Sequence, residues 1–311
     1  MQIFDHPEQL RELHAPVHWA MGFFDGVHCG HRRVIQAAHS PGALCGVLTF
    51  DRHPLELLRP AQAPLLLTPD ARRKEELIAA AGVDVLLRLP FTPELAALSP
   101  TAFLDTLAAA CRISGISVGT NWRFGHGGSG TPELLVQEGQ RRGFAVCVQE
   151  LAQEGGSAVS SSRIRTALAA GHLAQTAIML GRPFAIAGVV EHGQRLARKL
   201  GFPTANVHVP TCAALPPAGV YRVRCCLSGR VLHGIGNLGL RPTIDEQQKI
   251  MRLEVHFPGW QGDLYGQWLT IELVEHLRAE RRFPSLEALK TQIQQDISAI
   301  FPAGQTAPTS R

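Results

Sequence analysis

The sequence predicts two domains, an α/β domain with a parallel sheet and then a small β-barrel domain that a C-terminal helix closes. The chain has 311 residues, more than a single core usually fills. From residue 17 to about 180, short apolar runs alternate with helical patterns, which favours parallel strands joined by crossover helices. After Gly181-Arg182-Pro183, long β-like runs dominate. We therefore expect domains at 1–182 and 183–301 and a disordered tail at 302–311.

The strands expected in the first domain are short, apolar and bounded by Gly, Pro or polar residues, as buried strands are. They cover residues 17–21, 44–50, 83–89, 116–118 and 144–148. Ser99 and Thr131 each precede a proline, which places an N-cap hydroxyl before Pro at the first helical position. Gly171 and Gly181 are typical of C-terminal helix stops.

The second domain is expected to be mostly β, with strands at 184–190, 220–227, 231–238, 253–257 and 269–274. Ser228-Gly229 lies between two of these strands and predicts a hairpin turn. A last helix from Leu286 to Ile300 has apolar residues at spacings of three and four. That stripe can close the open side of a small barrel.

Composition and charge exclude several classes of protein. The chain is 45% hydrophobic and 18% charged, which indicates a compact globular protein. It shows no apolar run of about 18 residues and no signal-peptide order at its N-terminus, so we expect a cytoplasmic protein without membrane contact. Seven cysteines without a C-x-x-C pair suggest neither disulfides nor structural zinc.

The net charge of +4 is spread over short clusters rather than one face. Small phosphorylated ligands therefore fit better than nucleic acid. The sequence leaves a homo-oligomer open.

The strongest local signal is the Gly-rich segment from Gly22 to His31, between the first predicted strand and helix. Open α/β sheets bind ligands at such junctions. Glycines let the backbone approach a polyphosphate, and the helix N-terminus favours anions. His28 and His31 face the same side and can donate hydrogen bonds to an α-phosphate as it gains a fifth oxygen. The alternative is a Gly-rich turn with two surface histidines.

A second signal is the segment 159–165, V-S-S-S-R-I-R, which predicts a hydroxyl-rich N-cap followed by arginines in the first helical turns. Cations there oppose the helix dipole, whereas a bound polyphosphate would make them favourable. The alternative is an ordinary serine cap with solvated arginines.

Taken together, these segments resemble the bacterial bifunctional riboflavin kinase/FAD synthetase family, and further matches extend through both halves. The matching segments in the first half are G-F-F-D-G-V-H-C-G-H (22 to 31), T-F-D-R-H-P (49 to 54), L-S-P-T-A-F (98 to 103), G-T-N-W-R-F-G (119 to 125) and V-S-S-S-R-I-R (159 to 165). Those in the second half are L-G-F-P-T-A-N (200 to 206), P-P-A-G-V-Y (216 to 221), N-L-G-L-R-P-T (237 to 243), L-E-V-H (253 to 256), D-L-Y-G (263 to 266) and L-R-A-E-R-R-F (277 to 283).

The resemblance implies a Rossmann-like nucleotidylyltransferase domain that joins the AMP part of ATP to FMN, giving FAD. In that domain, His28 and His31 would serve adenylyl transfer. Residues implied to bind nucleotide or flavin are Gly22, Phe24, Asp25, Gly26, His53, Pro54, Asn121, Ser161, Ser162 and Arg165.

The resemblance also implies a β-barrel kinase domain that phosphorylates riboflavin to FMN with ATP, and Mg²⁺ for both steps. Thr204 and Asn206 would sit beside Mg²⁺, and Glu254 would be the general base. Gly201, Pro203 and Arg278 are implied to bind ligand. Without the family, Glu254 shares a strand face with Arg252 and His256, and a solvated β-face is the alternative.

Several positions depart from the family's pattern and keep other functions open. They are Phe23, Ala197, and the stretches 126–130 and 255–260. One alternative is an enzyme that retains a single activity or uses another nucleotide or flavin. Another is a flavin-binding regulator that catalyses little.

Overall fold

The computed structural model describes residues 1–192, 202–242 and 249–301. It divides into two compact units, Met1–Arg163 and Ile164–Arg311. The division falls inside a helix, and the boundary expected at 181–183 stays a prediction. The predicted disordered tail lies outside the described residues. Within the described ranges, no helix is long and apolar enough to cross a membrane.

The first unit is built on a six-stranded sheet in which all neighbouring strands are parallel, in the order β1-β4-β3-β2-β5-β6. The five predicted strands thus form the expected crossover sheet, and β1 is an added edge strand too short to predict. The strands are β1 (Gln2–Phe4), β2 (Val17–Met21), β3 (Leu44–Phe50), β4 (Val85–Leu89), β5 (Ile113–Gly119) and β6 (Ala145–Gln149).

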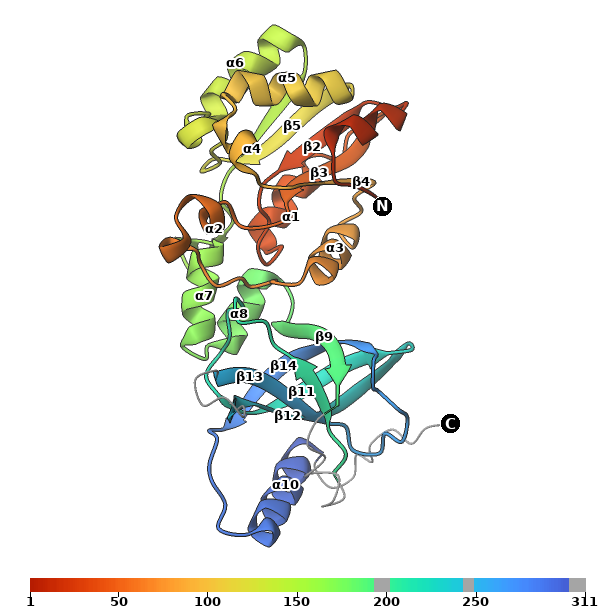
Figure 1. Cartoon of the computed structure of the whole chain (residues 1–311), viewed down its shortest axis with the longest axis vertical. Helices are drawn as coiled ribbons and strands as arrows, with labels where there is room; N and C mark the ends of the chain where they lie inside the picture. Colours follow the sequence, from red (N-terminus) through yellow and green to blue (C-terminus); the bar gives the residue numbers. More distant parts are fainter. Residues whose placement is uncertain (193–201, 243–248, 302–311) are drawn as a thin grey trace. The chain divides into compact units, whose positions relative to one another are not determined.

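Helices cover both faces of this sheet (Figure 1). Trp19 and Met21 of β2 pack in a core with residues of α5 and α6, whereas Ala20 packs in a core with residues of α1 and α3. Successive side chains of β2 therefore point to opposite faces of the sheet, and both faces are buried. The helices are η1 (Pro7–Glu12), α1 (Cys29–Gln36), α2 (Pro54–Leu58), η2 (Pro60–Gln62), α3 (Ala71–Ala79), α4 (Pro93–Ala97), α5 (Pro100–Ala110), η3 (His126–Gly128), α6 (Pro132–Arg142) and α7 (Ser161–Ala169), with a small hairpin of β7 (Gln153–Glu154) and β8 (Ser157–Ala158) before α7.

The predicted helix boundaries are confirmed at their caps. The Ser99 hydroxyl accepts a hydrogen bond from the Ala102 N–H at 3.2 Å, and the Thr131 hydroxyl accepts one from the Leu134 N–H at 3.3 Å. Gly181 ends α8 (Leu173–Leu180) in the left-handed conformation, with φ of 67°. Each cap satisfies backbone groups that the helix end leaves open.

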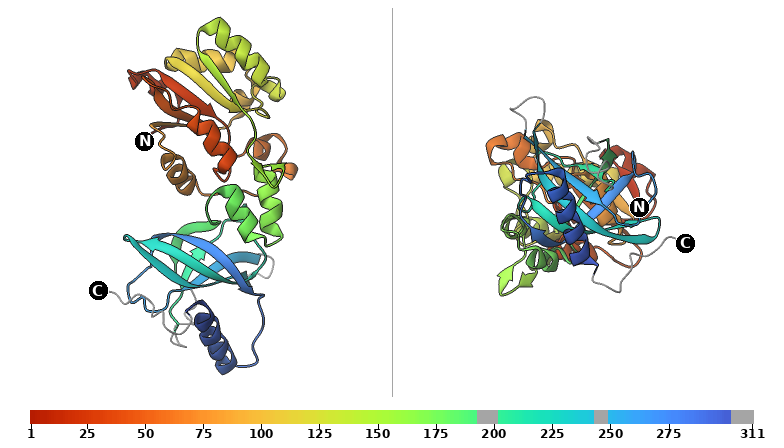
Figure 2. Two further views of the ribbon diagram at one scale, coloured as in Figure 1. Left: turned by 180° about the vertical axis from the view of Figure 1, so that it is seen from behind. Right: turned by 90° about the horizontal axis from the view of Figure 1, so that it is seen from below.

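The second unit contains a closed barrel of antiparallel neighbours in the order β10-β13-β12-β11-β14-β9, seen from behind in Figure 2. The strands are β9 (Ala185–Glu191), β10 (Ala205–His208), β11 (Gly219–Leu227), β12 (Arg230–Pro242), β13 (Lys249–His256) and β14 (Trp268–Arg278). The predicted turn is confirmed, because Ser228 and Gly229 both have positive φ, 50° and 76°, as a type I′ hairpin requires. Strand β10 was not among the predicted strands.

The last helix, α10, spans Leu286–Ile300 as predicted and begins at the N-cap Ser285. The barrel closes through its own strands, and the helix follows it. No residue of its apolar stripe is fully buried, and Leu286 is 51% exposed. The predicted fold class, α/β followed by a β-barrel with a terminal helix, is confirmed.

Candidate functional site

Three loops of the first unit meet at the carboxyl edge of its sheet. Strand β2 lies between β3 and β5, so the strand order reverses there. The turn 22–27 follows β2, the segment 51–53 follows β3, and Asn121 follows β5. Ligands bind at such a topological switch point in open α/β sheets. Most of the residues predicted for adenylyl transfer therefore lie along one edge.

The turn after β2 has a strained backbone. Phe24 and Val27 have φ of 58° and 39°, and Gly26 has φ of 81°. Such conformations cost about 1 to 3 kcal/mol at a non-glycine residue and persist where surrounding contacts impose them. One such contact is the buried Asp25 carboxylate, whose Oδ1 accepts hydrogen bonds from the Leu67 and Thr68 N–H groups at 2.9 and 3.1 Å.

His28 and His31 lie together at the N-terminus of α1. His28 is the N-cap, and its Nδ1 accepts a hydrogen bond from the His31 N–H at 3.3 Å. The two rings stack with centroids 3.6 Å apart, and a Cβ at Gly30 would lie 3.1 Å from the His28 ring. Because Nδ1 accepts, the neutral His28 ring carries its proton on Nε2, where it can serve an oxyanion.

His53 and Pro54 form the start of α2. The His53 Nδ1 accepts a hydrogen bond from the Leu55 N–H at 3.2 Å. The Phe23 ring meets the His53 ring edge-on at 4.8 Å. Phe23, which departs from the family's pattern, thus joins the turn after β2 to the segment after β3.

Lys74 of α3 is a residue that the sequence argument missed at this site. Its Nζ lies 4.0 Å from the centroid of the Phe23 ring, and the side chain is buried. Burial lowers the pKa of Lys74 to about 7, against the opposing attraction of Asp25 and Asp51. The available signal was its position four residues before Ile78 on the apolar face of α3, which its place beside Arg72 and Arg73 obscures.

The 159–165 segment begins α7, and its hydroxyls have separate tasks. The Ser160 Oγ accepts a hydrogen bond from the Arg163 N–H at 3.3 Å, which makes it the cap, and the Ser161 Oγ donates to the Asp25 carbonyl at 3.0 Å. Ser162 is exposed. Arg163 is held in an ion pair with Glu154 at 2.8 Å. Arg165 lies on the same helix, half-buried, in the second unit.

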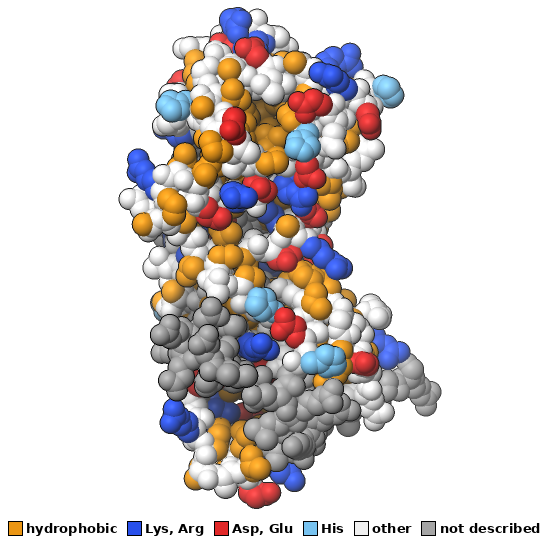
Figure 3. Space-filling model, in the orientation of Figure 1, with side chains coloured by type: hydrophobic (Ala, Val, Ile, Leu, Met, Phe, Trp, Pro, Cys, Tyr) orange, Lys and Arg blue, Asp and Glu red, His pale blue; other side chains and the backbone are white. Residues whose placement is uncertain are grey.

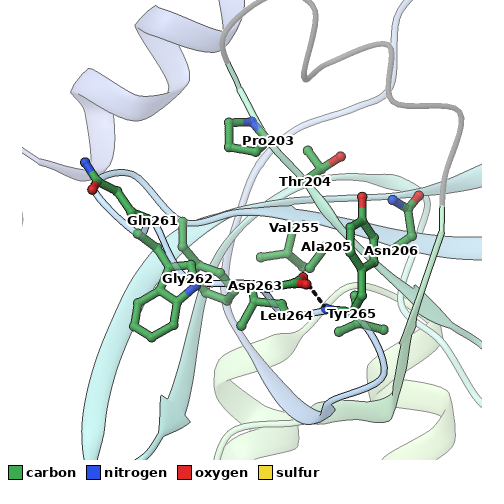
Figure 4. Close-up of a pocket in the computed structure, with 13 residues that line it drawn as sticks. Pro203, Thr204, Ala205, Asn206, Val255, Gln261, Gly262, Asp263, Leu264 and Tyr265 are labelled. Carbon is green, nitrogen blue, oxygen red and sulfur yellow. Dashed lines mark hydrogen bonds between the residues drawn. The ribbon is translucent and has the colours of Figure 1, made fainter.

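Two pockets of the second unit share the residues Thr204 and Asn206 of the P-T-A-N segment. The larger, about 610 Å³, lies between this segment and the loop 260–265, as Figure 4 shows, and we call it the 610 Å³ pocket. The smaller, about 340 Å³, is also lined by Glu254 and Arg278, and we call it the 340 Å³ pocket. Two ligands placed in these pockets would meet beside Thr204 and Asn206.

Glu254 lies in a row of polar residues across three adjacent strands. It pairs with Asn206 of β10 on one side and with Asn237 of β12 on the other. Asn206 is only 4% exposed, and its Oδ1 is buried without a hydrogen-bond partner among the described residues. A buried carbonyl oxygen in this state is suited to a cation or a donor supplied by a ligand.

Of the remaining predicted kinase residues, Pro203 lines the 610 Å³ pocket and Arg278 lines the 340 Å³ pocket. The Pro203 carbonyl accepts a hydrogen bond from the Nδ1 of His256 at 2.8 Å. Burial lowers the pKa of His256, and that hydrogen bond opposes the shift. Gly201 and Ala197 lie outside the described residues. Sequence reasoning assigned no ligand contact to the loop 260–265, although D-L-Y-G (263 to 266) overlaps it. It also missed Asp296 of α10, which lines the 340 Å³ pocket.

Comparisons with known proteins agree with the two halves of the chain. A family model described as FAD synthetase matches residues 10–163, and one described as riboflavin kinase matches residues 180–301. Curated relatives are named bifunctional riboflavin kinase/FMN adenylyltransferase. The relative from Pseudomonas fluorescens is 38% identical over 304 residues, 96% of each chain. The relative from Escherichia coli strain K12 is 39% identical over 282 residues, 89% of each chain.

A solved structure described as a macrolide-efflux protein from Streptococcus pneumoniae is similar over 96% of this chain and 97% of that one, with a TM-score of 0.81. At 24% identity, this likeness shows the fold alone. The identity to the curated relatives, in contrast, extends through both domains. The chain therefore belongs to the bifunctional riboflavin kinase/FMN adenylyltransferase family, with a nucleotidyltransferase domain followed by a kinase domain.

Proposed function

We propose that the barrel phosphorylates riboflavin between its two pockets and that the switch point of the α/β domain transfers AMP to FMN. The observation that carries the kinase assignment is that Thr204 and Asn206 line both pockets while Glu254 lines one. ATP would occupy the 610 Å³ pocket and riboflavin the 340 Å³ pocket.

In the kinase step, Glu254 takes the proton of the terminal hydroxyl of riboflavin as its oxygen attacks the γ-phosphorus of ATP. The new O–P bond forms as the bond to the β,γ-bridging oxygen breaks, and ADP leaves. FMN is the product. Asn206 and Asn237 flank Glu254 across the strands and keep its carboxylate among polar groups.

Mg²⁺ fits the residues present. The Thr204 hydroxyl and the orphaned Asn206 Oδ1 are hard oxygen donors of the kind that this ion prefers. No group of three His, Cys, Asp or Glu side chains in the described part of the chain could hold a metal by itself. An ion held by few protein ligands keeps waters and phosphate oxygens, as Mg²⁺ does. When bound, it would neutralise charge on the phosphates.

In the adenylyl step, a phosphate oxygen of FMN attacks the α-phosphorus of ATP, and pyrophosphate leaves. The Nε2–H of His28 and the stacked His31 ring would donate to the phosphate oxygens as charge builds up. The turn residues Gly22, Phe24, Asp25 and Gly26 bring the backbone to the polyphosphate. Further contacts are proposed for His53, Pro54, Asn121, Ser161, Ser162 and Arg165.

The expected partners are these small molecules. On the face shown in Figure 3, Lys and Arg side chains are interspersed with acidic and apolar ones and form no continuous basic patch. That nucleic acid is not a ligand stays a prediction. The cytoplasmic location and a homo-oligomer stay predictions.

The test is a time course with pure protein, riboflavin, ATP and Mg²⁺, in which FMN and FAD are resolved. FMN should form first and then convert to FAD, and His31→Ala should let FMN accumulate. Loss of both activities in a folded His31→Ala protein would contradict two separate sites. A protein that binds flavin but forms neither product would be the non-catalytic regulator, and one that stops at FMN would retain a single activity.

A further inference from the structure

Helix α10 is unusual because its one fully buried residue is acidic. Asp296 is 5% exposed, whereas Leu286 of the same helix is 51% exposed. Amphipathic helices normally bury their apolar stripe and leave carboxylates in water. The position of Asp296 therefore reflects a specific partner rather than general packing.

That partner is Arg278, the last residue of β14. The Asp296 carboxylate accepts hydrogen bonds from the Arg278 Nη2 at 2.8 Å and from its Nε at 3.1 and 3.2 Å. The Gln292 Nε2 donates to the same carboxylate at 2.8 Å. A bidentate guanidinium–carboxylate pair fixes orientation as well as distance.

The pair joins the helix to the barrel at the 340 Å³ pocket. Asp296, Leu289 and Ile293 of α10 line this pocket together with Glu254 and Arg278 from the barrel strands. The 610 Å³ pocket, in contrast, contains no residue of α10. A change in the position of α10 would therefore alter one pocket and leave the other intact.

We propose that Asp296 is a positioning residue for riboflavin phosphorylation, which holds Arg278 and α10 so that Leu289 and Ile293 form one wall of the flavin pocket. The proposal rests on the proposed function, which places riboflavin in the 340 Å³ pocket. Removing the negative charge of Asp296 leaves the Arg278 guanidinium without its counter-charge. The ion pair that connects α10 to β14 is then lost.

The main experiment compares Asp296→Asn with the wild type in the full chain. The KM for riboflavin and its Kd, measured by flavin fluorescence, should rise by about tenfold or more, which corresponds to about 1.4 kcal/mol. The KM for ATP should stay unchanged, and kcat should fall far less than riboflavin affinity. Thermal unfolding checks that the barrel is folded, and FAD formation from supplied FMN should be unchanged.

Two further variants keep the test decisive. Arg278→Lys retains the charge but cannot form the bidentate pair, so it should raise the same KM, and it replaces Asp296→Asn if that protein does not fold. Glu272→Gln is the matched control, because Glu272 pairs with Arg224 between β14 and β11 and lines neither pocket. It should leave the KM for riboflavin unchanged.

The proposal is overturned if folded Asp296→Asn binds riboflavin normally, or if Glu272→Gln weakens it equally. It is also overturned if the KM values for riboflavin and ATP rise together. Glu254→Gln separates this failure from failure of the proposed function. If Glu254→Gln abolishes phosphorylation while Asp296→Asn behaves as wild type, only the role of Asp296 is wrong.

Discussion

Lys74 is a single residue whose burial lowers its pKa beside the candidate adenylyl-transfer site. Its ammonium lies over the Phe23 ring and donates a hydrogen bond to the Phe50 carbonyl at 3.5 Å. Desolvation outweighs the attraction of Asp25 and Asp51, so its pKa falls from 10.5 to about 7. The charge of Lys74 therefore changes near neutral pH.

This shift predicts a pH dependence of stability. Between about pH 7 and 10.5, the unfolded chain binds a proton on Lys74 that the folded protein lacks, so the free energy of unfolding rises with pH. Below pH 7 both states are protonated, and the destabilisation is complete. Lys74→Met removes this contribution. In urea unfolding, the free energy of unfolding of the wild type should rise relative to that of Lys74→Met between about pH 6.5 and about pH 9.5. If the wild type and the variant differ by the same free energy at both pH values, Lys74 keeps its charge.

A second prediction for a single residue separates the two roles of His28, the N-cap of α1 and the proposed hydrogen-bond donor to the phosphate. Asn is a good N-cap, so His28→Asn should retain the cap of α1 while removing the imidazole. FAD formation should fall by about 10² to 10³, the usual effect of losing one oxyanion donor, with FMN formation unchanged. His28→Ala should show the same loss and also a stability lower by about 1 kcal/mol. Normal FAD formation by His28→Asn would exclude His28 from the chemistry.

Helices and strands were predictable where the local sequence pattern determines their bounds. Strands β2 and β3 have the predicted bounds because they are apolar runs with polar ends, and α10 has them because Ser285 caps it. Strand β10 was missed because it has only four residues and its first two, Ala205 and Asn206, belong to the P-T-A-N segment, which has no strand pattern of its own. The burial of Asp296 was also unpredictable, because it depends on Arg278 in another element.

The β11–β12 hairpin supplies a prediction at this scale. Ser228 has φ of 50°, a conformation that Asn and Gly adopt more readily than Ser. Ser228→Asn should therefore raise the free energy of unfolding of the barrel by up to about 1 kcal/mol. Gly229→Ala should lower it by about 1 kcal/mol through the backbone alone, since its Cβ would meet no atom within 4 Å. Thermal unfolding measures both, and a stabilising Gly229→Ala would contradict the turn geometry.

At the scale of the whole molecule, the two candidate sites were predictable to different degrees. The α/β site follows from general rules, since strand order and helix N-termini predict where a phosphate ligand binds. The barrel site does not follow from such rules. Glu254 was equally compatible with a solvated face, and only the resemblance singled it out before the pockets were known.

The domains should therefore work apart. A fragment of residues 1–182 should be soluble and make FAD from supplied FMN. A fragment of residues 1–163 is the matched control, because it cuts α7 after its first turn and removes Arg165. It should lose FAD formation. An inactive but folded 1–182 fragment would contradict independent domains.

Glu254→Gln tests the two-site assignment most directly, because it keeps the size and a hydrogen-bonding oxygen of Glu254 but removes its basicity. The two activities are measured side by side, riboflavin phosphorylation and adenylylation of supplied FMN, with saturating substrates. Phosphorylation should fall by a factor on the order of 10² to 10⁴, the usual contribution of a general base, with riboflavin binding and FAD formation nearly unchanged. Near-normal phosphorylation by a folded, riboflavin-binding Glu254→Gln protein would contradict the assignment of the kinase reaction to the pocket beside Glu254.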